Sequence, residues 1–209
     1  AGEPLAGWMV TFFELITEYG KSGYVLGPLG VLFLALAALP PLATRMQQRV
    51  LAAIMVRVGF LFAAVAVPGL FGTIIKRLIG RARPLVGGNL DPTLFHPFGW
   101  RADYASLPSG HATTSFALMV AVSSLWPRAR TYALIYALMI AVSRIVVTAH
   151  YPTDVAMGAL LGIAGALMVR RWFAMRRLGF SFGPDGTVHQ YPGPSAKRVK
   201  VVARAILAD

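Results

Sequence analysis

The sequence predicts an all-α protein, a polytopic bundle of transmembrane helices. Three observations support this fold class. Hydrophobic residues make up 56% of the 209 residues and charged residues only 13%, with a mean hydropathy of +0.63. A soluble protein of this size could not bury so much apolar surface, so lipid is the expected solvent. Long apolar runs also recur along the chain, and most basic residues stand at their ends.

Five apolar runs supply the predicted spanning helices. Most approach the roughly 20 residues that a helix needs to cross a bilayer. The shortest run is rich in hydroxyl side chains (Thr113, Thr114, Ser115, Ser123 and Ser124), which can bond backbone groups or neighbouring helices when buried. We therefore expect this run at the centre of the bundle. The five runs cover approximately residues 24–43, 53–75, 110–126, 131–149 and 155–175.

The chain divides into three ranges. Residues 1–23 combine large apolar side chains with Glu14 and Glu18, which predicts an amphipathic segment lying at the membrane interface. Residues 24–179 form the predicted transmembrane domain. Residues 180–209 are polar and then basic, and we expect a cytoplasmic tail. Two interpretations of this tail stay open, a solvated segment and a helix that docks on anionic headgroups.

Charge patterning excludes one class of partner and predicts an orientation. A net charge of +12 would suggest nucleic acid in a soluble protein. Here the basic residues flank apolar runs, so we expect no nucleic-acid partner. Counting Lys and Arg in the connections places the C-terminus in the cytoplasm of a multi-pass protein of the cytoplasmic (inner) membrane.

The chain contains no cysteine, which excludes disulfides and thiolate metal sites. Gly158 and Gly162 permit close helix packing, more simply within the chain than between two copies.

Three short segments carry the polar residues that point to chemistry. Given the helix order, all three emerge on the same side of the membrane, the periplasmic or extracellular face. They are Lys76, Arg83 and Pro84 in KRLIGRARP, Pro108, Ser109, Gly110 and His111 in PSGH, and Ser143, Arg144, His150 and Asp154 in SRIVVTAHYPTD.

The cationic residues and one helix start form a predicted anion site. Arg144 lies inside an apolar run, where a charge is costly and usually functional. Its planar fork of donors suits phosphate oxygens, and Lys76 and Arg83 add positive charge. Ser109 stands at the N-cap position of the following helix, and Gly110 lets the backbone approach a ligand closely. Free N–H groups at such a helix start attract anions.

The histidines supply a nucleophile and a proton donor. His150 and Asp154 flank a proline that breaks the helix, so we expect a helix–loop–helix corner where their side chains meet. A carboxylate that accepts the proton of one imidazole nitrogen leaves the other nitrogen free to attack. His111, at a neighbouring helix start, is placed to act as a general acid. His96 and His189 have no such neighbours, and we interpret both as surface histidines.

Metal ligation is the competing use of these side chains. Two histidines and an aspartate could bind zinc. The three cationic residues of the same site would repel a metal ion and attract a phosphate. We therefore expect neither a metal nor another cofactor.

The three segments, read as K-x6-RP, PSGH and SR-x5-H-x3-D, resemble the motifs of the type 2 phosphatidic acid phosphatase (PAP2) superfamily, in its bacterial membrane-bound form. The resemblance implies a metal-independent lipid phosphatase that works through a phosphohistidine. It implies that His150 is the nucleophile, Asp154 its partner, and His111 the general acid and later the base. The residues that it implies for phosphate binding are Lys76, Arg83, Ser109, Gly110 and Arg144.

Several questions stay open at this point. Membrane members of this superfamily usually have six spanning helices, so a first helix is either missing from this sequence or replaced by the peripheral N-terminal stretch. Undecaprenyl pyrophosphate, phosphatidylglycerol phosphate, phosphatidate and lipid A 1-phosphate all suit the predicted site. Two alternative functions are a lipid phosphotransferase of the same fold and a non-catalytic transporter that binds lipid phosphates. The expected partners are the lipid substrate and membrane lipids, and the oligomeric state is not determined.

Overall fold

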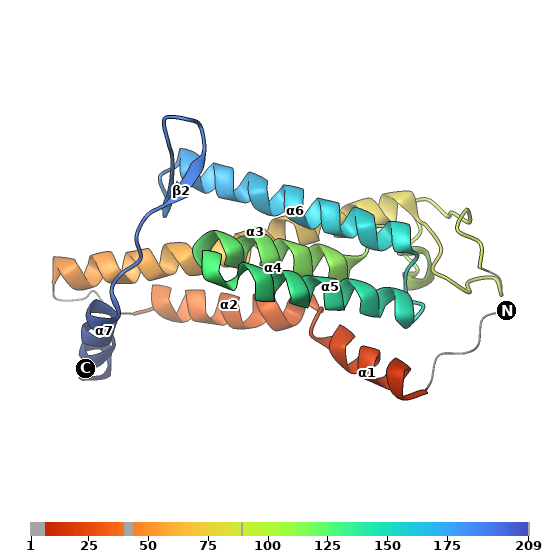
Figure 1. Ribbon diagram of the computed structural model, residues 1–209, viewed down its shortest axis with the longest axis horizontal. Coiled ribbons are helices and arrows are strands. Elements are labelled where there is room, and N and C mark those ends of the chain that lie inside the picture. Colours follow the sequence, from red (N-terminus) through yellow and green to blue (C-terminus); the bar gives the residue numbers. More distant parts are fainter. Residues whose placement is uncertain (1–6, 40–43, 89, 209) are drawn as a thin grey trace.

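A computed structural model describes residues 7–39, 44–88 and 90–208. Most of them form an elongated bundle of helices, with a hairpin and a last helix at one end (Figure 1). Short 3-10 turns at Ala102–Tyr104 and Pro127–Ala129 precede α4 and α5, and strands β1 (Phe180–Phe182) and β2 (Val188–Gln190) pair antiparallel. The helices are α1 (Gly7–Glu18), α2 (Ser22–Ala37), α3 (Arg45–Ile79), α4 (Gly110–Leu125), α5 (Arg130–Val146), α6 (Pro152–Met175) and α7 (Ala196–Ala208).

Each of the five predicted runs forms a helix, α2 to α6. Among the described residues, four helical stretches are long and apolar enough to cross a membrane, namely Gly7–Ala37, Arg45–Ile79, Pro127–Val146 and Pro152–Met175. α4 is not among them because it has only 16 residues. Residues 40–43 of the first run and residues 1–6 of the amphipathic stretch lie outside the described residues.

α3 is longer than the predicted run 53–75. Thr44 caps its start: the Thr44 side chain accepts from Gln47 N (3.2 Å), and the Thr44 N–H donates to the Gln47 side chain (3.0 Å). It ends before Gly80, which takes the left-handed conformation (φ 64°). Its 35 residues extend about 52 Å, more than the ~30 Å of a hydrocarbon core. The polar first turns of α3 therefore lie beyond the apolar part of the bundle.

α4 lies at the centre, packed against α3, α5 and α6, as predicted from its hydroxyl content. Thr113, Ser115 and Ser124 donate to backbone carbonyls three or four residues earlier in the chain. These hydroxyls are thus satisfied within the helix, which allows a polar helix to sit in an apolar bundle.

Two glycines of α6 bring α4 unusually close. A Cβ at Gly158 would lie 2.4 Å from the carbonyl oxygen of Ser109, and one at Gly162 would lie 2.4 Å from that of Thr113. Only glycine fits at such a contact, so the GxxxG step is used within the chain. The same approach lets Ser109 N donate to the carbonyl oxygen of Asp154 (2.9 Å), which joins the two helix starts.

Residues 180–208 of the predicted tail are folded. Phe180 of the hairpin is 2% exposed and packs edge-on against Phe60 of α3, with ring centroids 4.7 Å apart. Val202 of α7 is buried against Val50 at the start of α3. α7 therefore places its apolar face on the protein, and its Lys and Arg side chains remain exposed.

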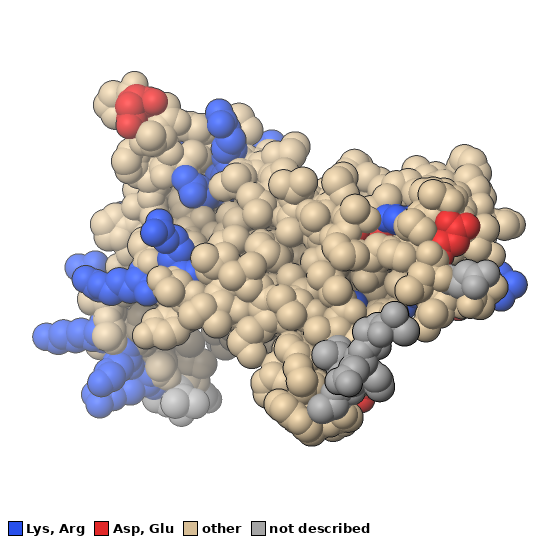
Figure 2. All heavy atoms as spheres, turned by 45° about the vertical axis from the view of Figure 1, so that its right-hand side comes forward, with Lys and Arg blue, Asp and Glu red and all other residues tan. Residues whose placement is uncertain are grey.

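The end of α3, the start of α4, the end of α5 and the start of α6 meet at one end of the bundle (Figure 1). This confirms the convergence of the three motif segments that the helix order predicted. Many Lys and Arg side chains gather at the opposite end, where α7 lies (Figure 2).

Candidate active site

The long connection between α3 and α4 folds back over the end of the bundle. Arg83 N donates to the carbonyl oxygen of Asp103 (2.8 Å), and Ser106 N donates to that of Arg81 (3.1 Å). These bonds tie the two ends of the connection together. Arg81, Arg83 and Ser106 are thereby held beside the starts of α4 and α6.

The connection between α5 and α6 forms the predicted corner. Thr148 takes a left-handed conformation (φ 52°), which commonly ends a helix. The N–H groups of Ala149 and His150 then both donate to the carbonyl oxygen of Arg144 (3.1 and 3.2 Å). Because Pro152 starts α6 directly afterwards, His150 is fixed between the two helices.

Asp154 is fully buried and is bonded by three donors. Its Oδ1 accepts from Arg81 Nη1 (2.6 Å), and its Oδ2 accepts from Ser106 Oγ (2.5 Å) and Tyr151 N (3.0 Å). His150 Nδ1 lies 3.8 Å from Oδ2 but 3.4 Å from Ser106 Oγ. The predicted direct hydrogen bond between His150 and Asp154 is therefore not made. The two side chains nevertheless lie close together as predicted, and Ser106 Oγ is near both of them.

Ser106 links the imidazole to the carboxylate. With its proton directed to Asp154, its oxygen can accept the Nδ1 proton of His150, which leaves the Nε2 lone pair free. Burial lowers the pKa of His150, which lies in the connection outside the spanning helices, and the nearby charges of Arg144 and Arg83 lower it further. Asp154 acts in the opposite direction, but burial is the larger effect. The ring is thus neutral at neutral pH.

Arg81 and Ser106 were not among the predicted site residues. Each stands close to a motif in the sequence, Arg81 two positions before Arg83 and Ser106 three before Ser109. One signal could have indicated Arg81, because a buried carboxylate such as Asp154 usually needs a cation beside it. No comparable pattern marks Ser106, whose role depends on how the connection folds.

Several buried polar atoms of the predicted site lack a partner. Arg83 Nε, Ser109 Oγ, His111 Nε2 and Arg144 Nε have no hydrogen-bond partner among the residues that the structure describes. Buried polar groups in proteins are rarely left unpaired. Four such atoms, drawn from all three motif segments at one end of the bundle, indicate a site for a ligand rich in acceptors.

The charges around these atoms are positive. A Cβ at Gly110 would lie 3.4 Å from Lys76 Nζ, so the ammonium group stands directly beside the start of α4. Lys76 interacts electrostatically with Arg83 and Arg144, and Lys76 and Arg144 both act on the His111 ring. In the described part of the chain, no carboxylate forms an ion pair with any of these three cations. An anion would therefore be attracted.

The start of α4 adds further donors. Ser109 occupies the predicted N-cap position, but its side chain makes no capping bond. The first N–H groups of a helix have no intrahelical partner, and the helix dipole makes this end positive. The Ser109 hydroxyl and these N–H groups are therefore available to the same ligand.

The other two histidines are exposed, as predicted. His189 belongs to the hairpin at the far end, where its ring contacts the Thr187 hydroxyl. Within residues 7–39, 44–88 and 90–208, no three His, Cys, Asp or Glu side chains are grouped so that they could hold a metal ion.

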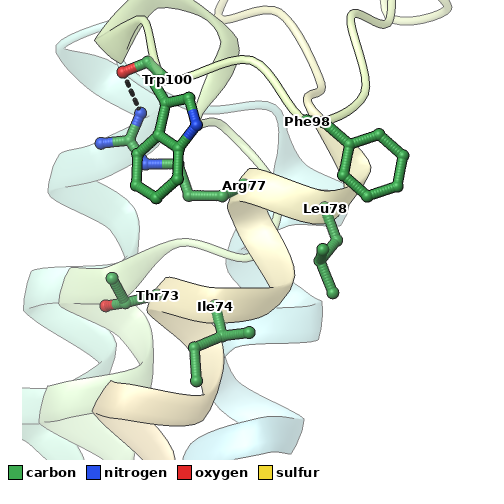
Figure 3. A pocket seen from close by; sticks show the side chains of 6 residues that line it. All are labelled: Thr73, Ile74, Arg77, Leu78, Phe98 and Trp100. Atoms are coloured by element: carbon green, nitrogen blue, oxygen red, sulfur yellow. Dashed lines mark hydrogen bonds between the residues drawn. The ribbon is translucent and has the colours of Figure 1, made fainter.

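An apolar pocket of about 350 Å³ lies on α3 next to the site. Figure 3 shows Phe98 and Trp100 of the long connection standing over the last turns of the helix. Arg77 donates to the carbonyl oxygen of Trp100 (2.5 Å), which ties the connection to α3. Arg77 interacts electrostatically with Lys76, so the pocket lies on the same stretch of α3 as the cationic site. Its lining is Thr73, Ile74, Arg77, Leu78, Phe98 and Trp100.

The sequence matches the PAP2 superfamily over residues 57–178. Two similar proteins are the lipid A 1-phosphatases of Rhizobium johnstonii and Rhizobium etli. Each is 34% identical to this chain over 187 residues, which is 89% of this chain and 74% and 78% of the two relatives.

Two solved structures share the fold. The crystal structure of Aquifex aeolicus LpxE has a TM-score of 0.58 and 23% identity, covering 79% of this chain and 87% of the other. The first transmembrane PAP2 type phosphatidylglycerolphosphate phosphatase from Bacillus subtilis has a TM-score of 0.51 and 18% identity, covering 80% and 77%. At these identities the likeness concerns the fold.

Proposed function

The chain belongs to the PAP2 superfamily, and on that premise we propose that it removes the 1-phosphate of lipid A through a phosphohistidine formed on His150. It is a multi-pass membrane phosphatase. The choice of lipid A rests on one observation, the 34% identity to lipid A 1-phosphatases over 89% of the chain. The geometry of the site supports the phosphatase chemistry.

Phosphate binding is assigned to the unpartnered donors. The three phosphate oxygens that carry charge accept hydrogen bonds from the guanidinium groups of Arg83 and Arg144, from Lys76 and from the Ser109 hydroxyl. The N–H groups at the start of α4, beginning with Gly110, complete the cradle. Such charge-assisted bonds are stronger than neutral ones, and burial strengthens them further. These donors also neutralise the charge that a divalent metal would otherwise balance.

The first chemical step forms a phosphoenzyme. Nε2 of His150 attacks the phosphorus, and the P–O bond to the lipid breaks as the P–N bond forms. The leaving oxygen takes a proton from His111, whose charged form is favoured by the bound phosphate dianion, and the His111 ring becomes neutral. Ser106 and Asp154 hold the other imidazole nitrogen and stabilise the positive charge that develops on the ring.

The second step releases phosphate. Neutral His111 accepts a proton from a water molecule, whose oxygen attacks the phosphorus as the P–N bond breaks. Inorganic phosphate leaves, His150 regains its lone pair, and His111 is again protonated for the next turnover. The lipid phosphate and one water molecule are the two reactants of the complete cycle.

The surroundings of the site suit a substrate held in a bilayer. The pocket beside Lys76 is lined mainly by apolar side chains of α3 and by Phe98 and Trp100. An acyl chain can therefore remain in an apolar environment while the phosphate reaches the cationic site. A water-soluble phosphate ester would make no use of this surface.

We assign the site to the periplasmic face from the gathering of Lys and Arg at the opposite end. The chain has no cysteine, so single cysteines can be introduced without background. A cysteine in the 85–105 connection should react with an impermeant reagent in intact spheroplasts, and Arg128→Cys should react only after lysis. The reverse pattern would invert the assignment.

Substrate choice is tested with purified protein and four lipids: lipid A, phosphatidate, phosphatidylglycerol phosphate and undecaprenyl pyrophosphate. We expect release of inorganic phosphate from lipid A with the highest kcat/KM, activity that survives EDTA, and inhibition by vanadate. Another preferred lipid would overturn the substrate but leave the phosphatase chemistry. Transfer of labelled phosphate to a second lipid, without free phosphate, would indicate a phosphotransferase.

A further inference from the structure

The N-terminal helix α1, which the sequence predicts as an interfacial segment, reaches the active site. α1 packs against α5, and the Tyr136 hydroxyl of α5 donates to the carbonyl oxygen of Tyr19 (2.8 Å) just after α1 ends. Residues 17–20 thereby lie beside the end of α5 that carries Arg144. This segment belongs to none of the three motifs.

Thr17 makes a specific contact with the site. Arg144 Nη1 donates to Thr17 Oγ1 at 2.6 Å, and both residues are only 8% exposed. On the same guanidinium group, Nε has no partner among the described residues. One N–H of the Arg144 guanidinium group is therefore bonded to α1, while the Nε–H stays available.

The same segment also contacts the general acid. A Cβ at Gly20 would lie 2.8 Å from Cδ2 of His111 and 2.7 Å from Cγ2 of Ile140. Since real Cβ atoms do not approach so closely, the backbone at Gly20 lies directly against the imidazole. Residues 17–20 thus form a wall of the site that touches both Arg144 and His111.

We propose that Thr17 is a positioning residue for phosphate binding, which orients the guanidinium of Arg144 so that its free N–H edge faces the phosphate. The proposal rests on the proposed function, in which Arg144 binds that phosphate. The neutral hydroxyl is suited to this role because it accepts one hydrogen bond without cancelling the charge. A carboxylate at the same place would form an ion pair with Arg144 and compete with the substrate.

The outer face of α1 is consistent with a helix held in place by lipid. Trp8, Phe12 and Leu15 of α1 and Tyr19 directly after it are all exposed, at 72%, 48%, 63% and 67%. An apolar outer face would be costly in water but favourable against a bilayer. Lipid on one side and α5 on the other would then fix the height of Thr17 relative to Arg144.

The test uses three substitutions at one position. Thr17→Ser keeps the acceptor, Thr17→Val removes it at similar volume, and Thr17→Asp keeps it but adds a negative charge. The readouts are KM and kcat for nitrophenyl phosphate, the inhibition constant of vanadate, and the shift of the thermal unfolding temperature by vanadate. Thr11→Val is the matched control, because Thr11 lies on the same helix with an exposed hydroxyl that donates to Gly7 O.

We expect Thr17→Val to weaken vanadate binding by roughly tenfold or more, the order for a hydrogen bond to a charged group. Thr17→Ser keeps the acceptor and Thr11→Val changes an exposed residue, so both variants should stay within about twofold of the wild type. Thr17→Asp should bind vanadate more weakly than Thr17→Val, since it neutralises Arg144. A loss of packing alone would not produce this order of vanadate affinities. It would instead lower kcat and stability in both Thr17→Val and Thr17→Asp.

Equal vanadate binding by Thr17→Val and the wild type would overturn the proposal, as would tighter binding by Thr17→Asp than by Thr17→Val. If Thr17→Val does not fold, the comparison of Thr17→Ser with Thr17→Asp decides, and equal vanadate affinities there count against the proposal. A wild-type protein that neither hydrolyses nitrophenyl phosphate nor binds vanadate would instead contradict the proposed phosphatase site itself. The two failures are therefore distinguishable.

Discussion

Both ends of the bundle carry arginines, but the N–H groups of these arginines differ in whether they have protein partners. At the end where α7 lies, Arg57 and Arg170 donate to the backbone carbonyls of Tyr191 and Val188 (2.9 and 3.3 Å), and Arg176 lies 4.3 Å from the ring centroid of Trp172. Their donors hold the hairpin and cover aromatic surface. At the site end, Arg83 and Arg144 keep buried N–H groups without a partner in the described residues.

The hydrogen-bond partners of an arginine therefore distinguish one that stabilises the fold from one that can bind a ligand. An arginine whose N–H groups are bonded to protein acceptors stabilises the local fold and offers no free donor to a ligand. A buried arginine with unpaired donors is costly to the fold, so its free N–H groups indicate a ligand that would bond to them. Arg81 shows that the site end contains both kinds, because Asp154 binds its guanidinium.

The largest contrast is expected between the histidines of the two ends. His150→Ala removes the nucleophile, so activity should fall to background and no acid-labile phosphoenzyme should form. His189→Ala, on the exposed hairpin, should keep wild-type activity. The measurement is phosphate release together with trapping of labelled phosphoenzyme. An active His150→Ala protein would contradict the assignment of the nucleophile.

His111→Ala keeps the nucleophile but loses the proton donor. We expect a loss of ~10²–10⁴-fold on a lipid phosphomonoester. The defect should shrink on nitrophenyl phosphate, because its leaving group needs little protonation. Steady-state rates on both substrates decide this, and an equal defect on both would mean that His111 acts in some other way.

The comparison between arginines is tested by Arg83→Gln and Arg176→Gln. Removal of a charged donor at the site should cost about 1.5–3 kcal/mol, or roughly 10–150-fold in kcat/KM. Arg176→Gln should leave kcat/KM unchanged and cost at most about 1 kcal/mol of stability, the range for an exposed cation–π contact. Similar kinetic losses in both variants would remove the distinction between the two ends.

The pH dependence of phosphoenzyme formation should reflect the burial of His150. Since burial lowers its pKa, the ring stays neutral and reactive to a pH below the ordinary range of histidine, and the rate falls only when it becomes protonated. Arg83 also lowers this pKa, so Arg83→Gln should move the acid limb of the profile to higher pH. The measurement is the rate of phosphohistidine formation from nitrophenyl phosphate between pH 4 and 8 (about the range in which histidines titrate). A shift to lower pH would have the wrong sign.

The smallest effect on catalysis is expected from the far end. Val202→Ala removes buried methyl groups from the contact between α7 and Val50, which should cost roughly 1–2 kcal/mol locally. Trypsin should then cleave at the basic residues of α7 several-fold faster, while kcat/KM stays unchanged. A change in kcat/KM would show that the two ends are coupled.

The sequence by itself determined the helices and the place where the motifs meet. Apolar runs long enough to cross a bilayer can be recognised from composition, and successive spans must alternate in direction. The order of the runs therefore brings Lys76, His111 and His150 to one end, as the structure confirms. The GxxxG step of α6 and the exposure of His96 and His189 were predictable for the same reason, because spacing and neighbours carry that information.

Only the tertiary structure decided how the site residues are held. Asp154 bonds Arg81 and Ser106, which are 73 and 48 positions away, and Arg144 bonds Thr17 across 127 positions. No periodicity links residues so far apart, because their contacts depend on how connections fold and how helices pack. Residues 180–208 gave a similar result, since the hairpin and α7 are ordered by contacts with α3 and α6 that a polar, basic sequence does not reveal.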